Sequence, residues 1–122
     1  MTIIEKITEV DVLHPNGFDQ NNKIAWLSNL DGRIKEEIID THEGGDGVIF
    51  KGYTPDDTNT ELIVPAPYDE LYRYWLEAQI DYANGEYTKY NNSMAMFNTA
   101  YSAYERYYNR THMPKGKSIK LF

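Results

Sequence analysis

The helical spacing of aromatic residues in the C-terminal third of the chain most limits the folds open to it. All but one of the eleven tyrosines lie between Tyr68 and Tyr108. In this stretch an apolar stripe advances in steps of four and three residues, the pattern of one helix face: Tyr90, Met94, Phe97, Tyr101, Tyr104 and Tyr108. The stripe predicts a helix that begins at Glu86 and reaches Arg110, unless the capping residues Asn91-Asn92-Ser93 split it.

A second stripe, of smaller side chains, lies beside the first: Ser93, Met96, Ala100, Ala103 and Tyr107. Small residues let another helix approach closely, and tyrosine combines an apolar ring with a polar tip, which suits a surface that meets a partner. We therefore predict a subunit or partner interface at Tyr74, Tyr82, Tyr87, Met96, Ala100, Ala103 and Tyr107. The competing interpretation is a thin core filled with tyrosine, and for the central stripe it is equally good.

Three other segments carry helical signals. Residues 8–13 can form a short helix that stops before Pro15, because proline disfavours helical geometry in the preceding residue. Apolar residues recur at three- and four-residue intervals over 20–40. A further helix is predicted to start at Pro67 and to end at Asn84-Gly85, since glycine can adopt the left-handed conformation that closes helices.

Two segments lack a helical pattern. Residues 41–64 are rich in glycine, proline and acids and predict a long acidic loop, or a small hairpin if Val48–Phe50 pairs with Glu61–Val64. The chain ends in a predicted extended tail, 115–122, that docks on a partner through Lys115, Lys117, Ile119, Lys120, Leu121 and Phe122. The predicted fold is thus mainly α: a small antiparallel helical bundle, with three main helices and a short N-terminal one, in a single domain over 1–114.

The charge is uneven along the chain. Residues 1–61 carry 13 acids and 5 bases, a net charge of −8, within a total of −7. Such an acidic surface repels phosphate, so we expect no specific nucleic-acid binding. The N-terminus lacks a secretory signal and no uncharged stretch is long enough to span a bilayer, so we expect no membrane partner and a cytoplasmic protein.

The sequence offers no convergent set of reactive side chains. The chain has no cysteine, and His14, His42 and His112 have no partner at a metal-ligand spacing. The glycines at 44–47 lack the Lys-Ser/Thr of a phosphate loop, and the acids of the loop lack a calcium-binding pattern. We therefore predict no catalytic, metal or cofactor site and no enzymatic activity.

Several blocks of the sequence resemble one family of phage proteins. They are ELIVPAPYDELY at 61–72, LEAQIDYANGE at 76–86, and the stretch from YNNS at 90–93 to YYNRTHMP at 107–114. Upstream, Trp26-Leu27, Leu30–Lys35 and Ile38-Ile39 extend the likeness to most of the chain. These blocks are similar to head-tail connector, or neck adaptor, proteins of phages and prophages of Gram-positive bacteria.

The resemblance implies a structural role in the virion neck. Proteins of this kind form a ring beneath the portal, extend the DNA channel and link the capsid to the next neck or tail protein. The expected partners are other copies of the chain, the portal protein and that downstream protein, and DNA passes through without specific binding. The protein would stay in the host cytoplasm until assembly.

A second hypothesis uses the acidic N-terminal half directly. A small acidic helical protein can mimic nucleic acid and occupy the binding site of a host enzyme. Such an inhibitor would act as a monomer or dimer, and its binding would weaken steeply with added salt.

Overall fold

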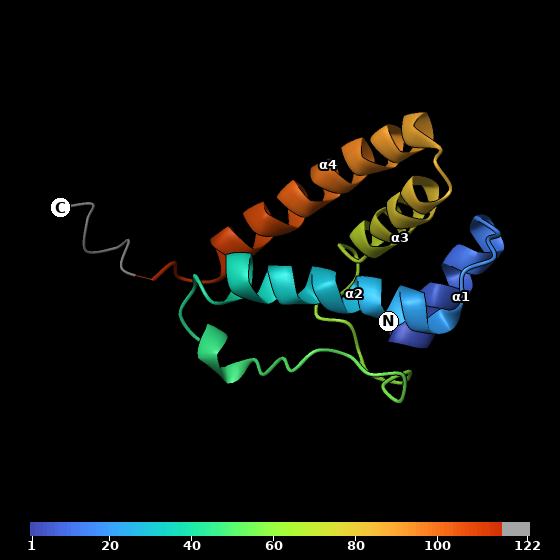
Figure 1. The fold of residues 1–122 in the computed structure, drawn as a ribbon. Coiled ribbons are helices and arrows are strands. Elements are labelled where there is room, and N and C mark those ends of the chain that lie inside the picture. Colours follow the sequence, from blue (N-terminus) through green and yellow to red (C-terminus); the bar gives the residue numbers. More distant parts are fainter. Residues whose placement is uncertain (116–122) are drawn as a thin grey trace.

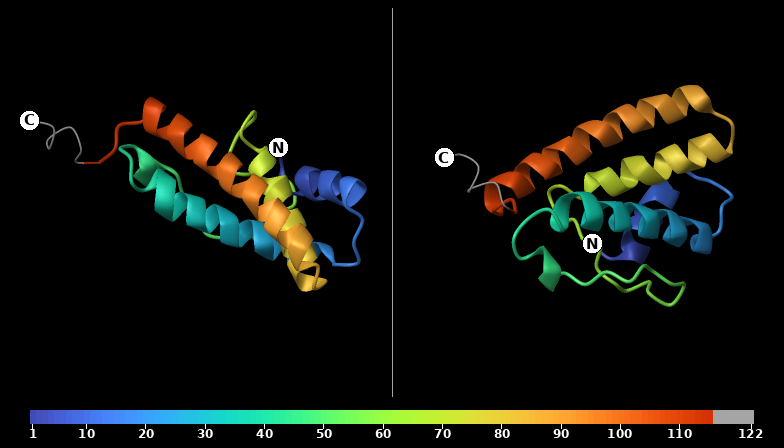
Figure 2. Two further views of the ribbon diagram at one scale, coloured as in Figure 1. Left: turned by 90° about the horizontal axis from the view of Figure 1, so that it is seen from above. Right: turned by 60° about the vertical axis from the view of Figure 1, so that its left-hand side comes forward.

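The computed structural model describes residues 1–115, which form the predicted mainly helical bundle (Figure 1). Its helices are α1 (Ile3–Leu13), α2 (Gln20–Ile34), α3 (Glu70–Ala83) and α4 (Tyr87–Thr111). Helices α3 and α4 form an antiparallel hairpin that packs on α2, with α1 at one end. In both views of Figure 2, the C-terminal end of α4 lies beside the end of α2 and the segment that follows it.

Helix α1 begins at Ile3, earlier than the predicted Thr8. The Glu5 backbone N–H donates to Thr2 Oγ1 at 3.2 Å, and the Thr2 N–H donates to Glu5 Oε1 at 2.8 Å. This reciprocal pair satisfies two N–H groups at the helix start, so the first turn is stable. The helix buries Ile3, Ile7 and Val10 in the core, and it ends before Pro15 as predicted.

Helix α2 and the turn that continues it cover 20–39, all but the last residue of the predicted helical range 20–40. The Asp19 carboxylate caps the start by accepting from the Asn22 N–H at 2.9 Å, and a π-helical turn, η1 (Lys35–Ile39), extends the end. One face is buried in the core: Ile24, Leu27, Leu30, Ile34, Ile38 and Ile39. Helix α3 is fastened to it by the Trp75 indole N–H, which donates to the Trp26 carbonyl at 2.9 Å.

Helix α3 starts at Glu70, so the predicted start at Pro67 is wrong. The preceding residues form a turn in which the Tyr68 N–H donates to the Pro65 carbonyl at 3.0 Å, and Asp69 is the N-cap. The predicted end is confirmed, because Gly85 takes a positive φ of 75° at the turn into α4.

Helix α4 runs unbroken through Asn91-Asn92-Ser93. Both asparagine side chains are exposed, so water competes with the helix backbone for hydrogen bonds to their amide groups. These side chains therefore do not interrupt the helix. The C-terminal part of the central stripe is buried, at 8% exposure or less: Phe97, Tyr101, Tyr104 and Tyr108. At the N-terminal end of the stripe, Tyr90 and Met94 are half-buried.

The segment between η1 and α3 is a long loop, and the alternative of a hairpin is wrong for it. Within residues 1–115 no strand forms, and a 3-10 turn, η2 (Gly45–Gly47), is its one helical element. The loop is fastened instead to the start of α1, where the N–H groups of Ile3 and Ile4 donate to Thr60 and Thr58 carbonyls at 3.0 and 2.9 Å. These N–H groups have no partner within the helix, and this makes them available to the loop.

Candidate assembly surfaces and the buried site behind them

An aromatic cluster lies at the tip of the α3–α4 hairpin. The Tyr82 ring meets the ring of Tyr87 edge-on at 5.5 Å between centroids and that of Tyr90 at 5.2 Å. Tyr82 and Tyr87 are nevertheless 58% and 59% exposed. The turn at Gly85 brings the last turn of α3 against the first turn of α4, so the rings gather without entering the core. We name Tyr82, Tyr87 and Tyr90 the tip cluster.

The outer face of α4 carries no charge over four turns. Between Lys89 and Glu105 the helix has no ionisable side chain other than tyrosine. Its exposed residues there are Asn91, Asn92, Ala95, Met96, Asn98 and Thr99, and Met96 is 51% exposed. The water-facing side of a surface helix normally carries charged residues. We name these six residues the uncharged face.

The structure divides the predicted interface residues into two groups. Tyr82, Tyr87 and Met96 are more than half exposed. The others are half-buried, namely Tyr74, Ala100, Ala103 and Tyr107. Tyr107 stacks on Tyr68 at 4.6 Å, and the Arg73 guanidinium lies 5.3 Å from the Tyr74 ring centroid. The second group thus contributes part of its surface to the molecule's own packing, and the interface itself stays a prediction.

The predicted docking tail lies almost wholly outside the described residues. Lys117, Ile119, Lys120, Leu121 and Phe122 belong to that part. Lys115 is described: its backbone N–H donates to the Thr41 carbonyl at 2.9 Å, and its ammonium lies 3.4 Å from Asp46 Oδ1. The start of the tail is therefore attached to the loop that follows η1.

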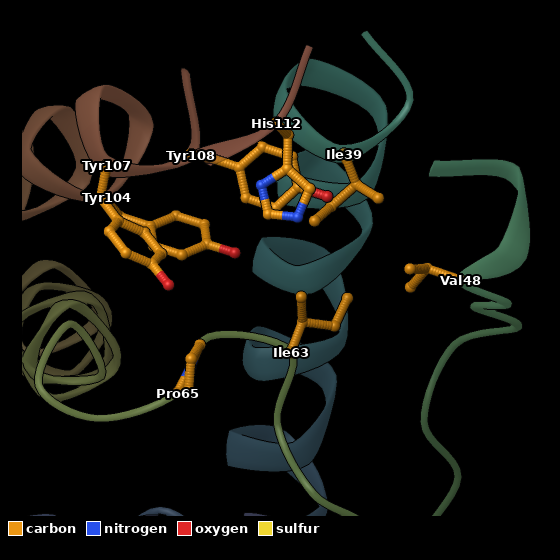
Figure 3. Close-up of a pocket in the computed structure, with 8 residues that line it drawn as sticks. All are labelled: Ile39, Val48, Ile63, Pro65, Tyr104, Tyr107, Tyr108 and His112. Carbon is orange, nitrogen blue, oxygen red and sulfur yellow. The ribbon is translucent and has the colours of Figure 1, made fainter. Parts of the chain in front are cut away.

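An apolar cavity opens beside the C-terminal end of α4 (Figure 3). It has a volume of about 280 Å³ and is lined by Ile39, Val48, Ile63, Pro65, Tyr104, Tyr107, Tyr108 and His112. The rings of α4 face Ile63 and Pro65 across it. The cavity was not predicted from the sequence, because its walls come from four separated segments. In the sequence, the signal for this cavity was the presence of the apolar residues Val48 and Ile63 within a polar loop.

Two histidines that lie far apart in the sequence, His42 and His112, come close together at this end, with 6.5 Å between their ring centroids. His42 is buried, with Nδ1 2.6 Å from the Ile38 carbonyl and Nε2 2.7 Å from Asn109 Oδ1. Tyr108 lies edge-on to His42 at 4.8 Å and stacks flat on His112 at 3.8 Å. Over the described range, no group of three or more His, Cys, Asp or Glu side chains could hold a metal ion. His42 instead joins the loop to α4 through hydrogen bonds.

A buried carboxylate holds the loop at two points, near its middle and towards its end. Asp31, on α2, has 0% exposure and accepts hydrogen bonds from the Tyr53 hydroxyl and from the Ile63 N–H, the latter at 3.2 Å. Its other oxygen accepts from the Tyr72 hydroxyl of α3 at 2.6 Å, and that hydroxyl accepts from the Val64 N–H at 2.8 Å. The group joins α2, α3 and the loop. This group was not predicted from the sequence, although an acid within the apolar pattern of α2 was a visible signal.

The protonation of this group follows from its burial. Burial raises the pKa of Asp31, and the hydrogen bonds from Tyr53, Tyr72 and Ile63 act in the opposite direction because they favour the carboxylate. Burial and the neighbouring carboxylate also raise the pKa of Tyr72 well above its ordinary value, so this hydroxyl keeps its proton to donate. The role of the group is therefore structural, because the Asp31 carboxylate accepts hydrogen bonds from two donors of the loop and one of α3.

Comparison with known proteins adds no relative. The chain matches no protein-family model, no curated protein and no solved structure. In the described part of the chain, none of the helices has the length and apolar character needed to cross a membrane.

Proposed function

We propose that the chain is a head-tail connector of a tailed phage, a structural protein that assembles as a ring beneath the portal and links the capsid to the neck or tail. Two lines of reasoning support the proposal. The sequence blocks described above resemble that family. Independently, the molecule has a surface suited to contacts with further copies.

The uncharged face of α4, continued by the tip cluster, is the single observation that carries the proposal. Copies with a net charge of −7 repel one another. Two like charges about 4 Å apart near a protein surface repel by about 4 kcal/mol, so close contact between copies favours a surface without acids. The uncharged face also offers Met96 and small side chains, and the tip cluster offers aromatic rings of the kind enriched at interfaces.

A ring also requires that each subunit present two different surfaces, because head-to-tail contacts are heterologous. The uncharged face supplies one of them. The acids of the N-terminal half lie elsewhere, and many are exposed: Glu36, Glu43, Asp46 and Asp56 are examples. If these acids face the channel, they repel DNA and let it pass without binding.

The decisive experiment places a charge on the uncharged face. Ala95→Asp introduces an acid at an exposed position of α4, and Ala25→Asp makes the same change at an exposed position of α2. We expect Ala95→Asp to weaken ring formation at least about tenfold, equivalent to about 1.4 kcal/mol per contact, and Ala25→Asp to have little effect. Light scattering and electron microscopy, with and without the portal protein, measure the rings. Equal effects of the two variants would contradict the proposal.

The nucleic-acid mimic makes the opposite prediction. Its contacts would use the exposed acids, so capture of a host enzyme would survive Ala95→Asp and weaken as salt rises. Contacts made by Met96 and the tip cluster depend much less on salt. Repeating both measurements at low and high salt separates the two functions.

A further inference from the structure

The cavity beside the end of α4 has room for apolar side chains but little more (Figure 3). Its volume is about 280 Å³. An apolar cavity of about 150 Å³ holds a benzene ring, and pockets for drug-sized ligands begin at about 300 Å³. The cavity therefore fits an aromatic ring together with one branched aliphatic side chain.

The walls of the cavity also favour an apolar occupant. Tyr104 and Tyr108, which are 2% and 7% exposed, line it with aromatic rings, and Ile39 and Ile63 line it with aliphatic side chains. An occupant that covers this surface is bound more tightly by about 25 cal/mol for each Å² of apolar area removed from water. Val48 is 37% exposed and lies at the cavity's margin, so the cavity is reachable from solvent.

The loop next to the cavity adds negative charge. The Glu43 N–H donates to the Met113 carbonyl at 2.7 Å, and the Asp46 carboxylate lies 3.4 Å from the Lys115 ammonium. Both acids are exposed, and Val48 follows them in the same loop. An extended peptide that joins apolar residues to lysines would match the cavity and its surroundings.

The C-terminal segment of this chain has that composition. After Lys115 it reads Gly-Lys-Ser-Ile-Lys-Leu-Phe, with no acid, two lysines and a final aliphatic-aromatic pair, Leu121-Phe122. Seven residues extend at most about 25 Å, at 3.3–3.6 Å each, which suffices to reach an adjacent molecule. We propose that the C-terminal segment of a second copy inserts Leu121 and Phe122 into the cavity, an inference that rests on the proposed assembly into rings.

Two observations favour a second copy over the chain's own tail. Pro114 and Lys115 line a neighbouring polar cavity of about 510 Å³, and they do not line the apolar one. Lys115 is also fastened there, by its N–H to the Thr41 carbonyl at 2.9 Å. A cavity on one copy filled by the tail of the next is a heterologous contact, the kind that propagates around a ring.

The absence of cysteine from the sequence makes the contact measurable by disulfide trapping in the full-length protein. One chain carries Val48→Cys at the cavity margin and a second carries Ile119→Cys, so Leu121 and Phe122 stay intact. The matched control replaces Val48→Cys with Val12→Cys, on the exposed end of α1. We expect the Val48–Ile119 heterodimer to form at least about tenfold faster than the Val12–Ile119 one, because docking raises the effective concentration of the thiols. Phe122→Ser in the Ile119→Cys chain should remove most of that advantage.

Each other outcome overturns the inference. A chain with both Val48→Cys and Ile119→Cys that closes on itself, without heterodimers in the mixture, would assign the cavity to the chain's own tail. Equal rates for the two pairs would show that the tail does not dock there. If trapping fails while Ala95→Asp still disrupts rings, this inference fails and the proposed function stands. If both fail, the proposed function fails with it.

Discussion

The two ends of α3 place tyrosine in opposite surroundings. Tyr72, in the first turn, has 0% exposure and exchanges hydrogen bonds with Asp31 and the Val64 N–H. Tyr82, in the last turn, is 58% exposed and contacts the rings of Tyr87 and Tyr90. A buried hydroxyl needs a partner, whereas an exposed one has water. The same residue type therefore contributes to folding at one end of the helix and is accessible to a partner at the other.

The loop between η1 and α3 resembles the buried end of α3, because close contacts hold it in place. Asp31 bonds to Tyr53 and Ile63 within it, and Phe50 lies 3.5 Å from the position that a Cβ on Gly32 would take. The loop is thus held by specific close contacts, while the tip cluster is open. Four predictions test this contrast.

The largest effect is expected at Gly45 in the loop. A Cβ there would lie 2.1 Å from the Ile39 carbonyl oxygen, whereas at Gly47 it would meet nothing within 4 Å. Because the clash is with backbone, no side-chain rotation can relieve it, and Gly45→Ala should lower the free energy of unfolding by about 3 kcal/mol. Gly47→Ala should change it by less than about 0.5 kcal/mol. Urea unfolding measures both, and similar values would contradict a tightly held loop.

A smaller loss is expected when the hydroxyl at the buried end of α3 is removed. Tyr72→Phe leaves an Asp31 oxygen and the Val64 N–H without this partner, which should cost about 2 kcal/mol of stability. Tyr82→Phe, at the exposed end of the same helix, should cost less than about 0.5 kcal/mol. Equal costs at the two ends would remove the contrast between them.

The next effect is a pH dependence at Asp31. Because burial raises its pKa in the folded state, the folded protein binds this proton more tightly than the unfolded chain does. The stability contributed by this group is therefore complete below the unfolded aspartate pKa of about 3.9 and is lost as pH rises through the folded value. The asparagine in Asp31→Asn does not titrate. The free energy of unfolding of the native protein, minus that of this variant, should therefore fall as pH rises. If that difference in free energy rises with pH instead, the hydrogen bonds to Asp31 outweigh the effect of its burial on its pKa.

The smallest effect on stability is expected at the tip cluster. Tyr87→Ser removes a ring that is 59% exposed, so it should cost at most about 1 kcal/mol, the range of one aromatic pair. The same variant should nevertheless weaken self-association, whereas Tyr87→Phe, which keeps the ring, should preserve it. Unfolding and light scattering on the same samples measure both. A large stability loss from Tyr87→Ser would show that the tip belongs to the core.

Local signals account for most of the fold that could be predicted. The central stripe of α4 and the stop at Asn84-Gly85 depend on side-chain period and on the φ of one residue, and both are visible in a short window. The start of α1 was predictable too, because Thr2 and Glu5 have the spacing of a capping box. The start of α3 was not, since Pro67 is equally suited to the turn that precedes the helix.

The amino-acid sequence alone was enough to predict the helices and to show that the chain has more tyrosine than one helix face can bury. The packing of the helices and the loop determines which of these rings are buried and which residues bury them. Asp31 bonds to Tyr53 and Tyr72, and Val48 and the rings of α4 line one cavity, across long stretches of chain. Such contacts depend on how whole helices and the loop pack together, and no short window of sequence carries that information.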